Sequence, residues 1–267
     1  MSGLMLLVLM LPLPVSAKQV FQTIASFPAS EANQGIAVDD QYFYAVDNYA
    51  IAKYDKQTGK LVDKWQGTKG GPVLHLDGGM VLDGKLYCAH SNYPDWPMTS
   101  SVEVWDTKTM KHIATHSFGI HWGSLTWLDR YNGFWWAGFA NYNLLQSSYP
   151  IPYGGVASTT IIKFDDNWQP QEAWVLPAKL LAKFENMSNS GGSWGSDGRL
   201  YLSGHDPAEV YVVKLPEAGS ILEWVDTIPM DIRGQGIAWD RSTTQGILYG
   251  IIRAKREVTV AKLVDVP

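Results

Sequence analysis

Short runs of alternating apolar and polar residues recur along the whole chain. Residues 51–55 and 101–106 both alternate in this way, which is typical of strands with one buried face. Turn signals such as Lys56–Gly59 separate the runs. Only residues 178–184 favour a short helix. The pattern therefore predicts an all-β chain of many short strands.

A short phrase, in which a glycine is followed by a few mostly apolar residues and an aspartate, occurs five times. Its glycines are Gly35, Gly78, Gly123, Gly192 and Gly236, which lie 43, 45, 69 and 44 residues apart. A period of about 40–45 residues is typical of one blade of a β-propeller, so the third blade is enlarged. Because innermost strands crowd around a narrow axis, the glycines are explained structurally and we assign them no catalytic role.

Each phrase is followed by further predicted strands. The second strands are predicted at residues 42–46, 85–89, 133–139, 199–204 and 246–251, and the fourth strands at 61–65, 112–117, 171–176 and 221–228. The fifth unit ends after its third strand, residues 258–263, and residues 20–27 supply the missing one. This closes the ring without a free edge. We predict one five-bladed β-propeller of four-stranded blades over residues 18–267.

Residues 1–17 read as a signal peptide. The apolar stretch 4–13 is followed by small residues, and cleavage is expected near Ala17 and Lys18. The stretch is too short to span a bilayer, and two prolines interrupt it. The usual basic region is missing, so an uncleaved anchor or a poorly ordered N-terminus stays open. We expect a secreted or periplasmic protein without a stable membrane span.

The composition supports a globular chain and narrows its partners. Hydrophobic residues make up 46% and charged residues 18%, which is enough for a sizeable core. The formal net charge of −5 comes without charge runs, which argues against nucleic acid as the partner. Aromatic residues at 12% suit strands and also ring-binding or peptide-binding clefts. We expect a monomer with a small-molecule or peptide substrate.

The loops of a blade alternate between the two faces of the disc. Connections between first and second strands, and between third and fourth strands, are short; we call their side the turn face. The remaining loops are long and define the loop face. They carry His90, Tyr93, Trp96, Tyr142, Tyr149 and Tyr153. Long loops on a rigid scaffold are the usual place for binding.

The inner strands begin at the loop face, and the second strands end there. The residues expected at this mouth of the channel are Gln34, His75, Asp77, His90, His121, Trp122, Ser190, His205, Gln235 and Arg253. Aromatic walls with a few converging polar groups fit a small-ligand pocket. Asp77 is the candidate catalytic residue, because burial before an inner-strand glycine would raise its pKa toward acid–base use. The alternative is a structural aspartate that caps a turn.

Metal and thiol chemistry find less support. The loop-face histidines show no His-x-His or His-x-x-x-His spacing, so we expect no metal and no cofactor. Cys88 is the only cysteine, which excludes an internal disulfide. It lies two residues before His90, and a buried cysteine is favoured over a Cys–His nucleophile.

Several motifs resemble the plant-type glutaminyl-peptide cyclotransferases, which also occur in bacteria. They are Phe27-Pro28 followed by Gln34-Gly35, Asp77 ten residues before Tyr87 in Lys85-Leu86-Tyr87, Trp122-Gly123, and Gly236–Asp240. The resemblance implies a five-bladed propeller with Asp77 in the place of the family's catalytic glutamate. The family's asparagine, tryptophan and lysine fall near Ser190, His205 and Arg253. Proteins loosely labelled cycloisomerases are also similar.

Three functions remain open from the sequence. The first is an exported cyclase or cycloisomerase that moves a proton at Asp77 without a metal. The second is a non-catalytic module that binds a peptide, sugar or cell-envelope ligand on the same face. The third is a purely structural interaction propeller, which would have no small-molecule pocket.

Overall fold

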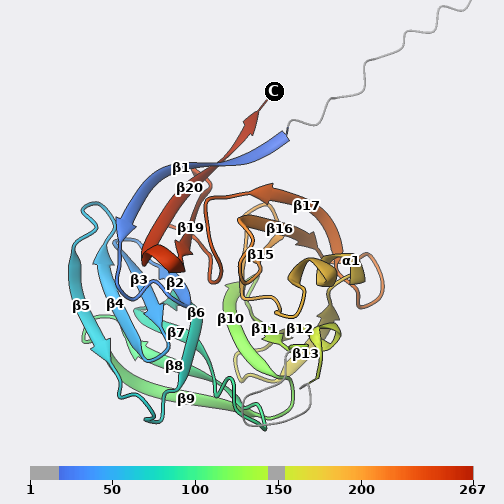
Figure 1. Cartoon of the computed structure of the whole chain (residues 1–267), viewed down its shortest axis with the longest axis horizontal. Helices are drawn as coiled ribbons and strands as arrows, with labels where there is room; N and C mark the ends of the chain where they lie inside the picture. Colours follow the sequence, from blue (N-terminus) through green and yellow to red (C-terminus); the bar gives the residue numbers. More distant parts are fainter. Residues whose placement is uncertain (1–17, 144–153, 267) are drawn as a thin grey trace, which may run out of the picture.

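The computed structural model describes residues 18–143 and 154–266, which form five four-stranded antiparallel sheets around a common axis (Figure 1). The first blade consists of β2 (Gly35–Val38), β3 (Tyr42–Asp47), β4 (Ala50–Asp55) and β5 (Leu61–Gln66). The second consists of β6 (His75–Leu82), β7 (Lys85–Ser91), β8 (Ser100–Asp106) and β9 (Lys111–Gly119). The third consists of β10 (Ser124–Tyr131), β11 (Phe134–Ala140), β12 (Thr160–Phe164) and β13 (Pro170–Val175).

The fourth blade consists of β14 (Gly191–Trp194), β15 (Leu200–Ser203), β16 (Glu209–Lys214) and β17 (Glu223–Pro229). The fifth consists of β18 (Ala238–Trp239), β19 (Ile247–Ile252), β20 (Glu257–Val266) and β1 (Lys18–Pro28). The predicted five-bladed propeller is therefore confirmed, and so is its closure by the N-terminal strand. The predicted leader, residues 1–17, lies outside the described residues.

Strand β1 holds the two ends of the chain together. Its register with β20 runs from Lys18 opposite Val266 to Pro28 opposite Glu257. The Phe27 ring of β1 stacks on Phe43 of the first blade, with 5.5 Å between the ring centroids. The strand thus completes the fifth blade and packs against the first.

The crossing between the third and fourth blades contains the predicted helix. It is a single turn, α1 (Ala178–Leu181), continued by the 3-10 helix η2 (Ala182–Phe184). Figure 1 looks onto the face that carries α1, which is the loop face. Two further 3-10 turns, η1 (Val156–Ser158) and η3 (Arg253–Lys255), lie in the second-to-third loops of their blades. No helix in residues 18–143 and 154–266 is long and apolar enough to cross a membrane.

The apolar faces of neighbouring blades pack against each other and form the core. Trp105, Trp127 and Trp194 are each at most 1% exposed, and Trp127 and Trp194 belong to one cluster between the third and fourth blades. Buried tryptophans of this size each remove a large apolar area from water. Much of the aromatic content therefore serves blade packing.

The innermost strands touch backbone to backbone at the loop-face end. A Cβ at Gly35 would lie 2.6 Å from the Cα of Gly78, and a Cβ at Gly236 would lie 2.6 Å from the Cα of Gly35. Only glycine fits at such distances. The structural explanation of these two glycines is confirmed. Gly123 has a different reason, a φ of 111° that side chains rarely adopt.

Candidate functional site

A β-bulge displays Asp77 at the loop-face end of β6. In the register of β6 with β7, Leu76 faces His90 and Gly79 faces Cys88. Asp77 and Gly78 therefore share the single position opposite Ala89. Bulges re-aim a side chain and are frequent beside active sites. The local irregularity is thus centred on the aspartate that the sequence singles out.

The Asp77 carboxyl is buried without full hydrogen bonding. The residue is 1% exposed, and its Oδ2 has no hydrogen-bond partner in the described structure. Burial raises the pKa of Asp77 well above its ordinary value, and the charge of Arg253 opposes this only in part. Burial therefore favours the protonated form of this carboxyl, which could donate a proton.

His75 lies beside this carboxyl. Its Nε2 is 3.4 Å from Oδ2 of Asp77, and its side chain is 14% exposed. Burial lowers the pKa of His75 to about 4, and the neighbouring His90 and Arg253 add to the effect. The imidazole is neutral at neutral pH. Asp77 and His75 thus form an acid–base pair, in which burial favours the protonated carboxyl and the neutral imidazole.

Two tyrosines from different blades surround the pair. The Tyr93 ring lies 5.3 Å from His75 and 5.0 Å from Tyr142, between ring centroids. Burial raises the pKa of both hydroxyl groups. The sequence analysis assigns both tyrosines to the loop face and does not place them against Asp77. Of the remaining predicted aromatics, Trp96 is exposed, and Tyr149 and Tyr153 lie outside the described residues.

The amide of Gln34 adds a second polar atom without a partner. Gln34 is 5% exposed, and its Nε2 donates a 2.8 Å hydrogen bond to Oδ1 of Asn48. Its Oε1 is buried and has no hydrogen-bond partner in the described structure. Gln34 precedes Gly35, whose backbone lies against Asp77 and Gly78. Asn48 was not among the predicted site residues.

The guanidinium of Arg253 is held by a histidine. Its Nη1 donates to Nε2 of His205 at 2.8 Å, and Nδ1 of His205 donates to Oδ2 of Asp206 at 2.6 Å. Asp206 thereby fixes the tautomer of His205 that accepts from the arginine. The predicted residues Arg253 and His205 are brought together. Asp206 was missed, and its only sequence signal is its place directly after His205.

The other predicted residues have structural contacts. His90 accepts a 3.0 Å hydrogen bond from the Leu74 amide at Nε2, and its Nδ1 lies 2.8 Å from Oγ of Ser101. The Ser190 amide donates to the Ser203 carbonyl. The Gln235 carbonyl accepts from the Ser203 hydroxyl.

Trp122 and His121 point elsewhere. The Trp122 ring packs against Phe118, Phe139 and Phe164, with centroid distances of 5.2–5.5 Å. His121 is exposed, and its ring lies 6.0 Å from that of Trp122. Neither residue is shown in contact with the Asp77–His75 pair. An aromatic residue at a strand start can face the apolar core between blades as readily as the channel. The Trp122 ring faces the core.

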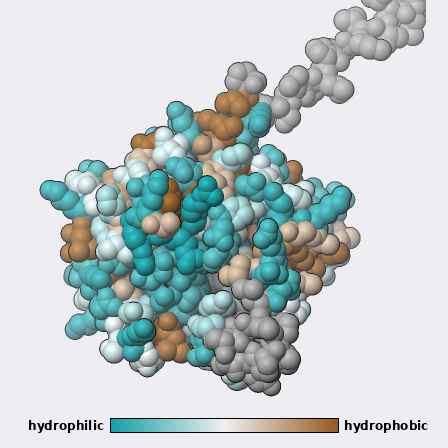
Figure 2. Space-filling model, viewed as in Figure 1, coloured by the Kyte–Doolittle hydropathy of each residue, from teal (hydrophilic) through white to brown (hydrophobic). Residues whose placement is uncertain are grey.

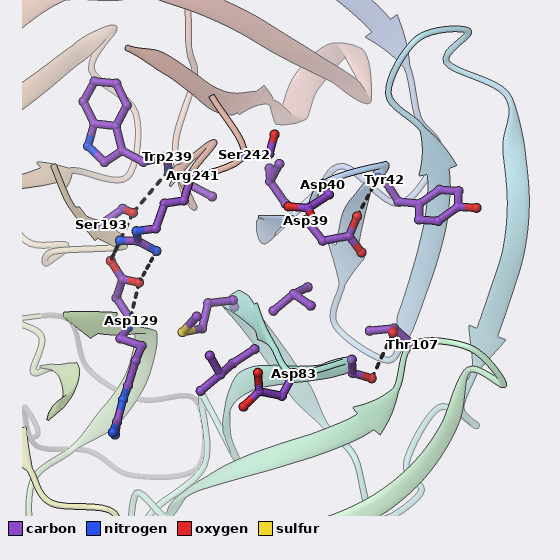
Figure 3. A pocket seen from close by; sticks show the side chains of 18 of the residues that line it. Asp39, Asp40, Tyr42, Asp83, Thr107, Asp129, Ser193, Trp239, Arg241 and Ser242 are labelled. Carbon is purple, nitrogen blue, oxygen red and sulfur yellow. Dashed lines mark hydrogen bonds and ion pairs between the residues drawn. The ribbon is translucent and has the colours of Figure 1, made fainter. Parts of the chain in front are cut away.

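A cavity of about 760 Å³ opens on the turn face, opposite to the face that the sequence favours. Figure 3 shows Asp129 and Arg241 beside it, with the guanidinium directed at the carboxylate. Arg241 donates to both oxygens of Asp129 at 2.8 and 2.7 Å, and Asp129 also accepts from the Trp194 amide at 2.7 Å. These contacts join the third, fourth and fifth blades. Asp129 and Arg241, two of the charged residues at the cavity, are therefore paired with each other.

Metal and thiol chemistry find no geometric support in the described part of the chain. No group of three or more His, Cys, Asp or Glu side chains is placed there to hold a metal ion. Cys88 is fully buried, and burial raises the pKa of its thiol.

Comparison with known proteins defines the class of the chain as a β-propeller. The fold is similar to a structure in the mitotic checkpoint complex, with a TM-score of 0.51, 9% identity and coverage of 99% of both chains. It is also similar to the hydrazine synthase of Kuenenia stuttgartiensis, with a TM-score of 0.51, 11% identity and coverage of 85% of this chain and 82% of that chain. At such low identity the likeness shows the fold alone.

No protein-family model and no curated protein matches the sequence. The resemblance to the glutaminyl-peptide cyclotransferases is thus not supported by a family match.

Proposed function

We propose that this chain is a propeller enzyme of the cyclase or cycloisomerase type, exported after removal of residues 1–17. Asp77 transfers a proton within a small polar substrate, and His75 serves as its partner. The observation that carries the proposal is the buried carboxyl of Asp77, whose Oδ2 has no hydrogen-bond partner among the described residues and lies 3.4 Å from Nε2 of His75. Such strongly perturbed pairs cluster at functional sites.

The neutral pair matches what an intramolecular cyclisation needs. Nε2 of His75 accepts the proton of the attacking group, and the Asp77 hydroxyl donates a proton to the leaving group. The protonated imidazole then returns its proton to the Asp77 carboxylate across their 3.4 Å separation. One bond forms, one breaks, and the pair ends in its starting state. Neither a metal nor a second substrate is required.

Tyr93 controls access in this proposal. Asp77 is 1% exposed, and the Tyr93 ring packs on both His75 and Tyr142. A substrate reaches the carboxyl when Tyr93 rotates away from His75. This tyrosine lies in the long loop between β7 and β8, where such a rotation does not disturb the strands.

The experiment is a screen followed by one substitution. The purified protein is assayed for turnover of peptides with N-terminal glutamine, lactones and unsaturated dicarboxylic acids. With any converted substrate, Asp77→Asn should lower kcat by about 100- to 10,000-fold, the usual contribution of general acid–base catalysis, while binding is retained. Asp83 is an exposed aspartate on the turn face, so Asp83→Asn is the matched control and should leave kcat unchanged. Unchanged turnover in Asp77→Asn would overturn the proposal.

The burial of Asp77 also favours a second candidate, a non-catalytic propeller that binds a peptide, sugar or cell-envelope ligand on the loop face. A carboxyl that no solvent reaches can serve a binding site by donating one hydrogen bond. In this case the screen yields a ligand that binds and is recovered unchanged.

A further inference from the structure

The guanidinium of Arg253 is a cation without an ionic partner. In residues 18–143 and 154–266, no carboxylate oxygen lies within 4.0 Å of it or of the exposed Arg233, whereas Arg130, Arg199, Arg241 and Arg256 each have one. Within the described residues, the side-chain hydrogen bond of Arg253 is the one to Nε2 of His205. Arginine presents five donors in a planar fork that matches a carboxylate, so most of this fork is available.

The Asp206–His205–Arg253 chain fixes the arginine in place. Asp206 is bonded to His205 at 2.6 Å, and His205 accepts from Arg253 at 2.8 Å. The Asp206 side chain is 77% exposed, so its charge is largely screened by water. These two hydrogen bonds orient the guanidinium but do not compensate its positive charge.

The neighbouring groups do not supply that negative charge. Arg253 is close enough to both Asp77 and His75 to shift their titration. Burial raises the pKa of Asp77 and so disfavours a negative charge there, and the nearby Asp47 is already paired with Arg256 at 3.0 Å. The centre of the loop face is also its most hydrophilic part, as Figure 2 shows.

We propose that this site binds a small carboxylate that carries a hydroxyl or N–H group close to the charge. The carboxylate pairs with Arg253, and the Asp77 hydroxyl donates a further hydrogen bond to it. The ligand's own donor meets Oε1 of Gln34, the buried acceptor that has no partner in the protein. The inference names the substrate class of the enzyme proposed above and rests on that site being used.

Three probes of one size test the charge and the donor separately. Lactate has both groups, lactamide lacks the charge, and propionate lacks the hydroxyl. Binding to the full chain is measured by ligand-observed NMR titration at neutral pH. Lactate should bind at least tenfold more tightly than lactamide and severalfold more tightly than propionate. Equal binding of lactate and lactamide would overturn the inference.

Substitutions locate the binding. Arg253→Gln should weaken lactate binding at least tenfold, and Arg256→Gln is the matched control because Arg256 is three residues away and ion-paired with Asp47. Lactate binding that survives Arg253→Gln would also overturn the inference. Should Arg253→Gln not fold, Asp206→Asn releases His205 from an exposed position and should weaken lactate binding severalfold; unchanged binding would count against the inference.

The outcome is distinguishable from that of the proposed function. Lactate binding through Arg253 together with unchanged turnover in Asp77→Asn would remove the enzyme and keep the anion site. Turnover that depends on Asp77 but is indifferent to Arg253→Gln would keep the enzyme and remove the carboxylate.

Discussion

Two aspartates of equal burial show how differently the protein treats a carboxyl group. Asp77 and Asp129 are each 1% exposed. Asp129 accepts two hydrogen bonds from Arg241 and one from the Trp194 amide, so its charge is compensated. Among the described residues, the one ion-pair partner within 4.0 Å of Asp77 is His75, and Oδ2 of Asp77 has no hydrogen bond. A buried group without a partner costs stability, and such costs are typical of functional sites.

The first prediction concerns the stability of Asp77→Asn. The unfolded carboxyl ionises near pH 4, whereas burial raises the pKa of Asp77 in the folded protein well above that value. The folded state therefore loses stability as the pH rises through this window, and an amide removes the loss. Asp77→Asn should be more stable than wild type by about 1–3 kcal/mol at pH 7 and no more stable near pH 4. Urea unfolding at several pH values measures the difference.

Asp129→Asn is the matched control and should act in the opposite direction. It leaves the Arg241 guanidinium without its carboxylate, at a loss of about 3 kcal/mol, the lower end for a broken buried pair because the Arg241 side chain is 42% exposed. A destabilised Asp77→Asn protein at pH 7 would show that Asp77 is a structural residue.

At the scale of single residues, the sequence identifies the candidate residue better than it predicts the side chains around that residue. Asp77 is identified from its place before Gly78, and the rise in its pKa follows from burial. The partners of a side chain are set by loops that meet only in three dimensions, so Tyr93, Tyr142 and Asp206 could not be assigned to this site. The position of the Trp122 ring in the core depends on one side-chain rotation, which an alternating pattern does not fix.

At the scale of single elements, the backbones of neighbouring inner strands lie very close together at their glycines. The repeated glycine phrase predicts five such strands because their crowding is a property of the propeller axis. What the phrase does not reveal is that the crowding differs between them. A Cβ at Gly35 would meet a backbone Cα at 2.6 Å, whereas a Cβ at Gly78 would have Thr126 O at 3.3 Å as its nearest neighbour.

We therefore predict different changes in unfolding free energy for two alanine substitutions in adjacent inner strands. Gly35→Ala forces β2 away from β6 and should lower the unfolding free energy by about 2–3 kcal/mol. Gly78→Ala should stay within about 1 kcal/mol of wild type, since a Cβ 3.3 Å from Thr126 O requires only a small backbone movement and the unfolded chain becomes less flexible. Chemical denaturation of the two variants decides. Equal losses in both would mean that the two inner strands are equally crowded.

The β6 bulge is an element-scale feature that the sequence does not disclose. The register shift at Asp77 and Gly78 needs one residue more in β6 than in β7, and no single turn signal marks it. Strand existence follows from alternation and spacing, whereas a bulge follows from how two strands meet. From the same segment, the sequence therefore predicts the strand but not the bulge that displays Asp77.

The whole molecule depends on one strand that is distant in sequence from the blade it completes. Without β1, the outer edge of β20 would expose its backbone groups, and Phe27 would leave the face of Phe43. The closure was predictable, because the fifth repeat lacks a fourth strand and the chain begins with an unassigned one. The position of the 760 Å³ cavity on the turn face was not, because side chains rather than strand order fill or empty the channel.

Removal of residues 1–28 should accordingly open the ring. The loss of one strand with its Phe21 and Phe27 contacts corresponds to about 4–6 kcal/mol of buried apolar area, or roughly 10–20 °C in melting temperature for a domain of this size. Removal of residues 1–17 alone should leave the melting temperature unchanged. Because the missing strand pairs only along its edge with β20, a synthetic peptide of residues 18–28 should restore the transition in trans, and a scrambled peptide should not. A shortened chain that melts like the full one would show that the four remaining blades and three strands close without β1.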